Sequence, residues 1–278
     1  MADKTIKHFV FSRFFPRQSQ EYLYNVLSTF FLKKQLPLAK NMFRSLENQT
    51  NKNFELVFVA NPKFFDDPKY EFIFSTLQAS TTLPLRFVKS ADIPALLKDA
   101  YDNYDFVIQS GMDFDDFVFK DAVADTQSKV SECNDMLTYG YSKGCIYSEN
   151  ELYAFLPKER GYLIDNSGYF SPFYSLVLKS SYAKTLPFIW TFGLPHSKII
   201  TKLKEIFAKN NIEFPADVYH RDDSINGIIY FRHEFSQEYL LGHNKVKGKK
   251  PLTTEETGIT KQQLEDEFGF FYDLNSIK

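Results

Sequence analysis

The stretch Phe106-Val-Ile-Gln-Ser-Gly-Met-Asp-Phe-Asp-Asp116 decides the fold expected of this chain. Its first half is short and apolar, which predicts a buried strand over residues 104–110. Three carboxylates in four positions follow, at Asp113, Asp115 and Asp116. Carboxylates this close repel one another, and a hard divalent cation relieves that repulsion. Because such a cation also binds phosphate oxygens, the stretch predicts a strand that ends at a metal-assisted phosphate site.

Strands and helices alternate on the N-terminal side of this stretch. Apolar runs predict strands at residues 8–12, 54–60 and 85–89, and helical patterns are expected at 32–48, 70–79 and 94–101. This alternation is typical of an α/β protein with a mostly parallel sheet and helices on both faces. Ligands bind such sheets beyond the carboxyl ends of the strands. We therefore expect Arg13, Asn61 and the three carboxylates, which each follow a predicted strand, to converge on one edge.

The chain changes character on the C-terminal side. Gly and Asn separate short runs that predict antiparallel strands at 136–141, 145–147 and 152–156, and Ser171-Pro172 predicts entry into a short helix. Residues 198–209 have the spacing of an amphipathic helix, which should stop in a left-handed conformation at Asn210-Asn211. We interpret residues 1–243 as one domain with halves at 1–125 and 126–243. A charged linker and a helix from Thr260 follow over residues 244–278.

The composition excludes several classes of protein. With 278 residues and a formal net charge of −2, the chain lacks the basic excess typical of nucleic-acid binding. Two cysteines, Cys133 and Cys145, are too few for a disulfide framework and favour a reducing cytoplasm. The N-terminus lacks the apolar core of a signal peptide, and no segment approaches the ~18 apolar residues of a membrane span. Peripheral contact with the inner membrane surface remains open through the lysines of 245–250, although such a run is more often a solvated linker.

Three blocks of the sequence resemble a known family. They are Phe9-Val-Phe-Ser-Arg-Phe14, Ser45-Leu-Glu-Asn-Gln-Thr50 with Asn53-Phe-Glu-Leu-Val57, and Asp113-Phe-Asp-Asp116. Over residues 7–200 the chain resembles the nucleotide-sugar glycosyltransferases of the GT-A fold, and in particular the rhamnosyltransferase family of bacterial polysaccharide loci. The resemblance implies a Rossmann-like, mostly parallel central sheet flanked by helices. It also implies a smaller antiparallel or mixed acceptor-side region, with residues 1–125 binding the nucleotide sugar, and it leaves the C-terminal helical tail, predicted above from its sequence pattern, unexplained.

The resemblance and the charge pattern together assign roles to the carboxylates. Asp115 is expected to bind Mn²⁺ or Mg²⁺ directly, and Asp113 to hold the donor ribose or sugar and to share the metal. In an extended segment residues two apart point the same way, so Asp116 should point aside and support the other two. The alternative is that these acids cap a helix that begins near Phe117.

Residues elsewhere complete the expected donor site. Arg13 is a candidate ligand of the diphosphate or the nucleobase, with a surface ion pair as its alternative role. Asn61 is expected to contact the nucleobase and stands where many relatives carry Asp. His196 is a candidate for a further metal or diphosphate contact, or else a loop histidine without a special partner. Relatives often place Arg shortly before the acidic cluster, whereas this chain has Ser110-Gly111-Met112 there.

Transfer to an acceptor hydroxyl with inversion also needs a general base. Asp165 is the first candidate for this base, and Asp223 is the second. The neighbouring pair Asp222-Asp223 resembles the acids that open a helix in related transferases, and could instead cap a helix N-terminus.

We therefore expect a metal-dependent, inverting glycosyltransferase of cell-surface polysaccharide or glycan biosynthesis. Its donor would be a UDP- or dTDP-linked sugar, with rhamnose implied by the resemblance, and its acceptor a glycan or lipid-linked glycan. One alternative is a metal-dependent phosphoesterase or nuclease that arranges the carboxylates of 113–116 and 222–223 around two ions. Another is a non-catalytic protein that binds nucleotide sugars.

Overall fold

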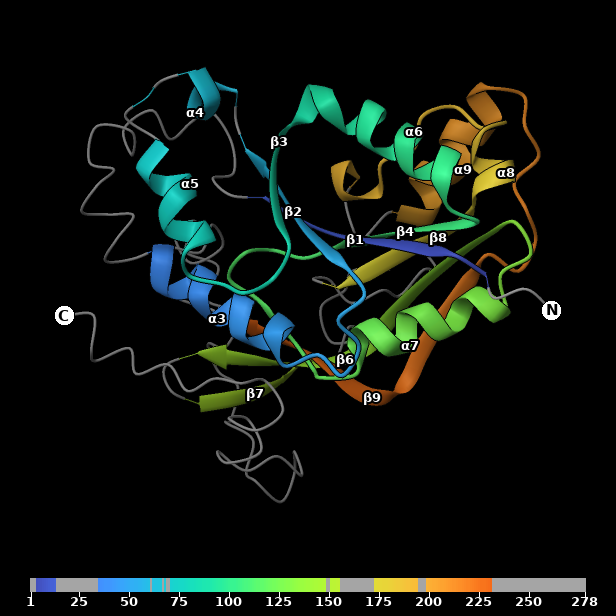
Figure 1. Ribbon diagram of the computed structural model, residues 1–278. Coiled ribbons are helices and arrows are strands. Elements are labelled where there is room, and N and C mark those ends of the chain that lie inside the picture. The colour runs from blue at the N-terminus through green and yellow to red at the C-terminus, as the bar shows by residue number, and fades with distance from the viewer. Residues whose placement is uncertain are drawn as a thin grey trace.

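A computed structural model describes the chain at residues 4–13, 35–60, 62–66, 68, 71–148, 151–155, 173–194 and 199–231. At Lys63, 142–148, 151–155, Tyr219 and 221–231 it describes the backbone alone. Over these residues the chain forms one mixed sheet of nine strands with helices on both faces (Figure 1).

The N-terminal half of this sheet is parallel, as predicted. Strand β1 (Ile6–Arg13) lies between β2 (Glu55–Ala60) and β4 (Phe106–Gly111), and β3 (Leu85–Lys89) lies outside β2. Every residue of β2 and β4 is buried, because both faces of a parallel sheet are covered, and this explains their mostly apolar sequences. The connections contain α3 (Leu36–Glu47), α4 (Lys63–Asp66), α5 (Glu71–Gln78), η4 (Ser90–Asp92) and α6 (Ile93–Asn103).

The C-terminal half continues the same sheet with mixed pairing. Strand β8 (Tyr174–Lys179) is antiparallel to β4, and β6 (Met136–Ser148) is antiparallel to β8. Beyond β6 lie β9 (Tyr219–Phe231), which is parallel to it, and β7 (Glu151–Phe155), which is antiparallel. The two-residue strand β5 (Phe117–Val118) pairs with the far end of β9. The α/β class with a mixed second region is therefore confirmed.

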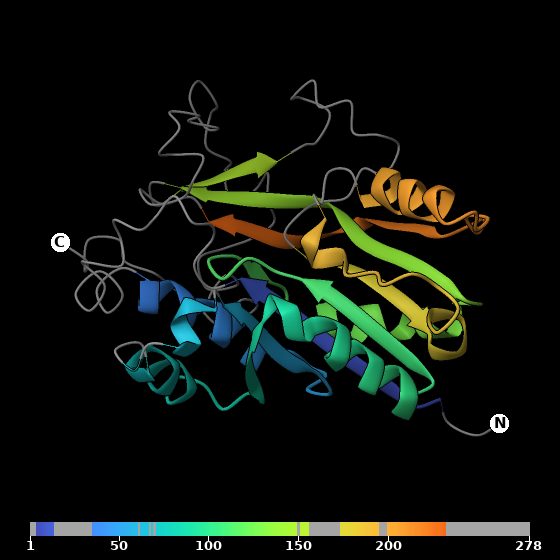
Figure 2. The same ribbon diagram turned by 90° about the horizontal axis from the view of Figure 1, so that it is seen from above.

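Strands β6 and β9 continue past the level at which β1 and β4 stop. The register places Phe11, Gly111, Tyr174, Gly140 and Arg221 in one row across five strands. Gly111 ends β4, whereas β6 runs on to residue 148 and β9 to residue 231 in the same direction. Figure 2 shows these two strands side by side. The sheet therefore has a step at the carboxyl edge of the parallel strands. We call β6 and β9, which extend further in that direction, the high side of the step.

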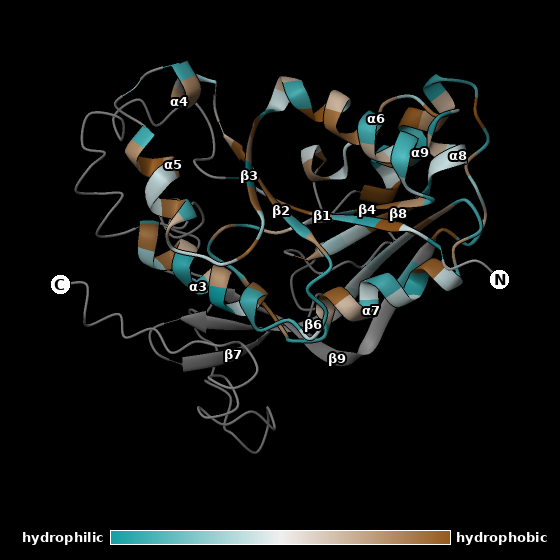
Figure 3. Ribbon diagram, in the orientation of Figure 1, coloured by the Kyte–Doolittle hydropathy of each residue, from teal (hydrophilic) through white to brown (hydrophobic). Residues whose placement is uncertain are grey.

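Two apolar cores fill the faces of the sheet. Even-numbered β1 residues such as Val10 face one core with α3, α5 and α7 (Ala122–Ser128), which η5 (Lys129–Ser131) follows. Phe9 and Phe11 face the other core with α6, α8 (Ser180–Ala183) and α9 (Ile199–Lys209). Figure 1 shows α6, α8 and α9 on one face of the sheet and α3 and α7 on the other. Helices α3, α6 and α9 carry both brown and teal bands in Figure 3, as amphipathic helices do.

Over the residues it describes, the structure confirms the predicted helices and strands of the N-terminal half, while residues 32–34 and 70, where two of the predicted helices begin, lie outside those residues. Helix α9 ends as expected, because Asn211 has a φ of 56° and so adopts the left-handed conformation that stops a helix. None of the described helices is both long enough and apolar enough to cross a membrane. The division of the chain at residues 125 and 243 stays a prediction, and the linker and helix of 244–278 lie outside the described residues.

Two predictions for the C-terminal half are wrong. The short helix expected after Ser171-Pro172 is strand β8 from Tyr174 onward, and a helix begins only at Ser180. The apolar run of β8 pairs with β4 on one side and β6 on the other, so ladder hydrogen bonds override the local helix signal. The strands predicted at 136–141 and 145–147 form the single strand β6. Register shifts around Lys143 take the place of the predicted turn.

A line of polar side chains crosses the apolar core of the sheet. His8 Nε2 lies 2.8 Å from Ser110 Oγ, which lies 2.5 Å from Ser175 Oγ. On the other side of the ring, His8 Nδ1 lies 3.3 Å from Gln127 Nε2. Because an amide nitrogen donates, Nδ1 accepts and Nε2 carries the proton given to Ser110. Complete burial lowers the pKa of His8 from 6.5 to about 3, so this histidine is neutral in the folded protein.

We predict that acid weakens the fold through His8. The unfolded chain protonates this histidine below about pH 6.5 while the folded chain does not, so stability present above that pH is lost as the pH falls. The expected loss between about pH 7 and pH 5 is ~2 kcal/mol, measurable by urea denaturation. His8→Gln should lower the stability at pH 7 but remove this part of the slope. An unchanged slope in the variant would contradict the assignment.

Candidate active site

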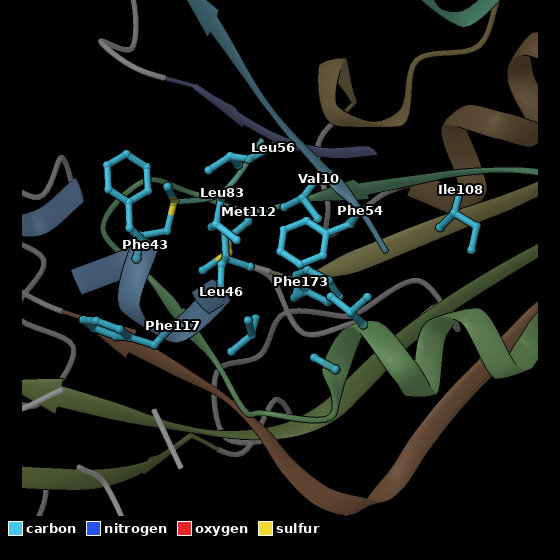
Figure 4. Packing of buried hydrophobic residues seen from close by; sticks show 14 of the residues in the cluster. Val10, Phe43, Leu46, Phe54, Leu56, Leu83, Ile108, Met112, Phe117 and Phe173 are labelled. Carbon is cyan, nitrogen blue, oxygen red and sulfur yellow. The ribbon is translucent and has the colours of Figure 1, made fainter. Parts of the chain in front are cut away.

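The carboxyl edge of β1 and β4 brings together Arg13 and the acidic residues, as the sequence predicted. Phe11 pairs with Gly111, and Met112 extends the ladder by donating its N–H to the Phe11 carbonyl at 2.9 Å. Arg13 is thus two residues beyond this pair on β1, and Asp113 is two residues beyond it on β4. Met112 is fully buried and lies among Leu46, Leu56 and Leu83 in the core (Figure 4).

The three carboxylates lie in a turn, which we call the acidic turn (residues 113–116). Asp116 donates its N–H to the carbonyl of Asp113 at 3.2 Å, so the segment is not the extended one from which side-chain directions were predicted. The prediction of side-chain directions from an extended segment was therefore wrong, although Asp116 does differ from Asp113 and Asp115 in its burial. Asp116 is 1% exposed, whereas Asp113 and Asp115 are half-buried. Asp113 and Asp115 are therefore the two carboxylates that a ligand at this edge can reach.

The acidic turn does not cap a helix. Phe117 and Val118 form strand β5, and the next helix, α7, begins at Ala122 with Asp121 at its N-cap position. The alternative role considered for the three acids is thus wrong. Their place between two strands leaves the ligand-binding interpretation open to test.

The residues of the acidic turn suit a hard cation that is only partly held by protein. Carboxylate oxygens are the ligands that Mg²⁺ and Mn²⁺ prefer, and Mg²⁺ usually takes one or two of them together with water and phosphate oxygens. Among the described residues, no group of three His, Cys, Asp or Glu side chains could hold a metal by itself. Two half-buried carboxylates therefore fit an ion that arrives with its phosphate. His196, predicted as a further ligand, lies outside the described residues.

Tyr174 links the basic and acidic sides of the edge. This residue starts β8 opposite Gly111, and its hydroxyl donates to the carbonyl of Thr191 at 2.9 Å. Burial raises the pKa of Tyr174 well above its usual value, the Arg13 charge lowers it, and the Asp113 charge raises it. One buried phenol thus lies within electrostatic range of both a cation and a carboxylate.

Residues 189–193, which we call the strap, cross this edge and include η7 (Thr191–Gly193). Gln109, in the middle of β4, fastens its start. The Gln109 amide donates to the Ile189 carbonyl at 3.2 Å, and its oxygen accepts the Thr191 N–H at 3.3 Å. Sequence analysis missed Gln109 and Tyr174. A fully buried amide in an otherwise apolar strand was the available signal, because a buried polar group requires partners.

Arg13 fastens the other end of the strap. Its Nη2 donates to the Phe192 carbonyl at 2.8 Å, and its guanidinium lies 4.6 Å from the centroid of the Phe192 ring. Among the described residues these are its partners, and no carboxylate is one of them, so the surface ion pair considered for Arg13 is not found there. The Nε of Arg13 is also buried without a hydrogen bond. Arg13 is therefore an oriented cation whose charge an anionic ligand would balance.

Gly111 makes room for the strap. A Cβ at this position would lie 2.6 Å from Cδ2 of Phe192 and 2.9 Å from Cζ of Tyr174, closer than real Cβ contacts. A side chain at this position therefore has no space here. The Phe192 ring occupies the space beside Gly111 and lies against the Arg13 guanidinium.

The remaining predicted site residues are placed only in part. Asp222 and Asp223 lie in strand β9, with Asp222 opposite Tyr141, so the predicted role at the start of a helix is wrong. Their backbone follows Arg221 in the row that passes through Gly111, about 14 Å away across three strand spacings. Asn61 and Asp165 lie outside the described residues.

A parallel α/β half that ends in an arginine and an acidic turn, joined to a mixed second region, is the architecture that the sequence led us to expect of the GT-A class. A family model described as "Putative rhamnosyl transferase" matches residues 34–229. The chain belongs to this family. No curated protein matches it.

Solved structures resemble the chain at low identity. The S. aureus protein TarS is 13% identical, with a TM-score of 0.42 over 83% of this chain and 37% of that one. Its fragment 1–349 gives the same identity and TM-score over 81% and 60%. A "putative nucleotide-diphospho-sugar transferase" from Desulfovibrio desulfuricans G20 is 11% identical, with a TM-score of 0.39 over 88% of this chain and 89% of that chain. The chain thus spans less than two thirds of either TarS chain.

We predict that Gly111→Ala destabilises the protein by displacing the Phe192 ring. Overpacking of this size costs about 1–3 kcal/mol of unfolding free energy, measured by urea denaturation. Phe192→Leu frees space at the same point, so the double variant should lose less stability than the two single losses added together. Additive losses would show that the two residues do not compete for one volume.

Proposed function

We propose that this protein transfers a sugar from a nucleotide diphosphate to a glycan acceptor, with inversion, in the synthesis of a cell-surface polysaccharide or glycan. The family description suggests rhamnose as the sugar. One observation carries the proposal. Arg13, a cation without a carboxylate partner among the described residues, lies at the same edge as a turn with two accessible carboxylates. Tyr174 is within electrostatic range of both Arg13 and Asp113. A diphosphate that brings a divalent ion matches both halves of this arrangement.

The carboxylates of the acidic turn would hold the ion. We assign Asp115 as its direct ligand and Asp113 as a ligand shared with the ribose or sugar of the donor. A bound Mn²⁺ or Mg²⁺ neutralises the charge that develops on a leaving diphosphate. Asp116, buried behind the other two, keeps the turn in shape through its N–H bond to Asp113.

Arg13 would hold the diphosphate from the other side. A guanidinium forms forked hydrogen bonds to phosphate oxygens, and its orientation is set in advance by Phe192. Because the side chain is already ordered, less conformational entropy is lost when the donor binds. The strap thus supports donor binding through Arg13.

The acceptor hydroxyl would need a base. Asp165 and Asp223 are the candidates from the sequence, and the position of Asp223 adds support for the second. It follows Arg221 on the high side of the step, at the level where β4 ends. An acceptor bound against β9 would then stand across from the donor diphosphate.

We predict that UDP or dTDP with Mn²⁺ raises the melting temperature, and that Asp115→Asn abolishes the Mn²⁺-dependent part of the rise. Nucleotide at about 100 times its Kd should add ~3 kcal/mol of stability. Asp99 is an exposed carboxylate on α6, so Asp99→Asn is the matched control and should keep the full rise in melting temperature. If Asp115→Asn responds to Mn²⁺ like the control, the assigned ligand is wrong.

We also predict turnover that depends on an acceptor. A panel of UDP- and dTDP-linked sugars, dTDP-rhamnose among them, should release nucleotide faster when a glycan acceptor is present. Hydrolysis of simple phosphodiesters without any acceptor would instead indicate a phosphoesterase. Metal-dependent nucleotide binding with no turnover on any donor would indicate a binding protein.

A further inference from the structure

The side chain of Gln49 joins the end of α3 to the segment that follows the acidic turn. It is 1% exposed, and its Nε2 donates to the carbonyls of Ser45 at 3.0 Å and Phe119 at 2.7 Å. Its Oε1 accepts the N–H of Val123 at 3.0 Å. Both donors and the carbonyl oxygen of this amide are therefore engaged, two of the three bonds reaching a segment 70 or more residues away.

Thr50 repeats the connection on the outside. Its N–H donates to the carbonyl of Lys120 at 2.7 Å, and its hydroxyl donates to Oδ1 of Asp121 at 2.7 Å. Gln49 and Thr50, with residues 119–123, form what we call the clamp. The clamp joins one sequence block noted at the outset, which ends in the Gln-Thr pair, to the segment that follows another, the acidic stretch.

The acidic turn is held between two anchors. On one side, β4 ends at Gly111 and Met112 is fixed by its bond to Phe11 and by its burial. On the other side, β5 is two residues long and pairs with β9 at both of them. Such a short ladder holds a chain segment weakly by itself. The clamp begins at Phe119, directly after β5, and ties it to α3. The position of the turn therefore depends on both anchors, and the clamp is part of the second, together with the burial of Phe117 and Val118.

We infer that Gln49 and Thr50 are positioning residues for the acidic turn. The structural part of this inference rests on the hydrogen bonds alone, while its consequence for metal and donor binding rests on the proposed function. Misplacement of a ligand by about 1 Å can cost on the order of 100-fold in rate, so a small shift of the turn has a large effect. The role of Gln49 is to act through Asp113 and Asp115, without touching a ligand itself.

The test uses two variants and two matched controls in the full chain. Gln49→Met keeps the volume and removes every bond of the amide, and Thr50→Val removes the hydroxyl of an exposed residue with little risk to folding. Gln127→Met removes an amide that bonds to Asn51, Asn53 and His8 instead. Thr81→Val removes a hydroxyl that ties the same end of α3, through Glu47, to the loop before β3.

Two readouts are measured on each variant. Hydrogen exchange over residues 112–121 reports the turn directly, without any ligand, and includes the Asp116 amide that bonds to Asp113. Mn²⁺ titration in the presence of UDP or dTDP, followed by melting temperature, reports the proposed site. We expect Gln49→Met to speed exchange there and to weaken the apparent Mn²⁺ affinity at least tenfold. Thr50→Val should act in the same direction, Thr50→Ser should restore both values, and the controls should change neither.

The outcomes separate this inference from the proposed function through Asp115→Asn. If Thr50→Val and Gln49→Met match their controls in exchange over 112–121, the positioning role is overturned. If they differ from the controls in exchange while wild type and Asp115→Asn respond alike to Mn²⁺, the positioning role stands and the proposed function fails. If Asp115→Asn loses the Mn²⁺ response while the clamp variants keep it, the consequence for binding is overturned and the proposed function stands. Should Gln49→Met not fold, the comparison of Thr50→Val with Thr81→Val decides.

Discussion

The parallel pairing of β4 with β1 is the interaction on which the rest of the structure depends. It sets Phe11 opposite Gly111, and this one pair fixes how far Arg13 stands from the start of the acidic turn. The same strand pairs on its other side with β8, so Tyr174 is brought to the same level. A slip of one residue in either ladder would turn every buried side chain of β4 to the opposite face. The two apolar cores prevent such a slip, because both faces of β4 are filled.

The candidate site is supported from both faces of the sheet. On the face with α6 and α9, Gln109 and Arg13 hold the strap. On the face with α3 and α7, Gln49 holds the segment that leaves the acidic turn. Gln109 and Gln49 are both buried amides that bond to backbone groups of a distant segment, and losing any of these partners costs stability. The two carboxylates proposed to meet the ligand stand between these supports.

Local sequence was enough for the parallel half and for the place of the acidic turn. The near-continuous apolar run of 54–60 requires burial on both faces, which a parallel sheet covered by helices on both sides provides. It was not enough for β8, whose strand state depends on two partners elsewhere in the chain. Nor could it reveal the partner of Gln109 or the crowding at Gly111, which arise between segments about 80 residues apart. The turn within 113–116 was missed because the prediction assumed an extended backbone there. In the structure the backbone turns, and the Asp116 N–H bonds to the carbonyl of Asp113.

The step formed where β6 and β9 run past β4 means that part of the candidate site is bordered by sheet and not by loops. Backbone in a paired strand holds its shape when a side chain is exchanged, since its peptide groups are already bonded to a neighbour. Substitutions along β9 should therefore reshape this border locally, and the register shifts between Asp222 and Ile229 mark where the alternation of side chains between the two faces is interrupted.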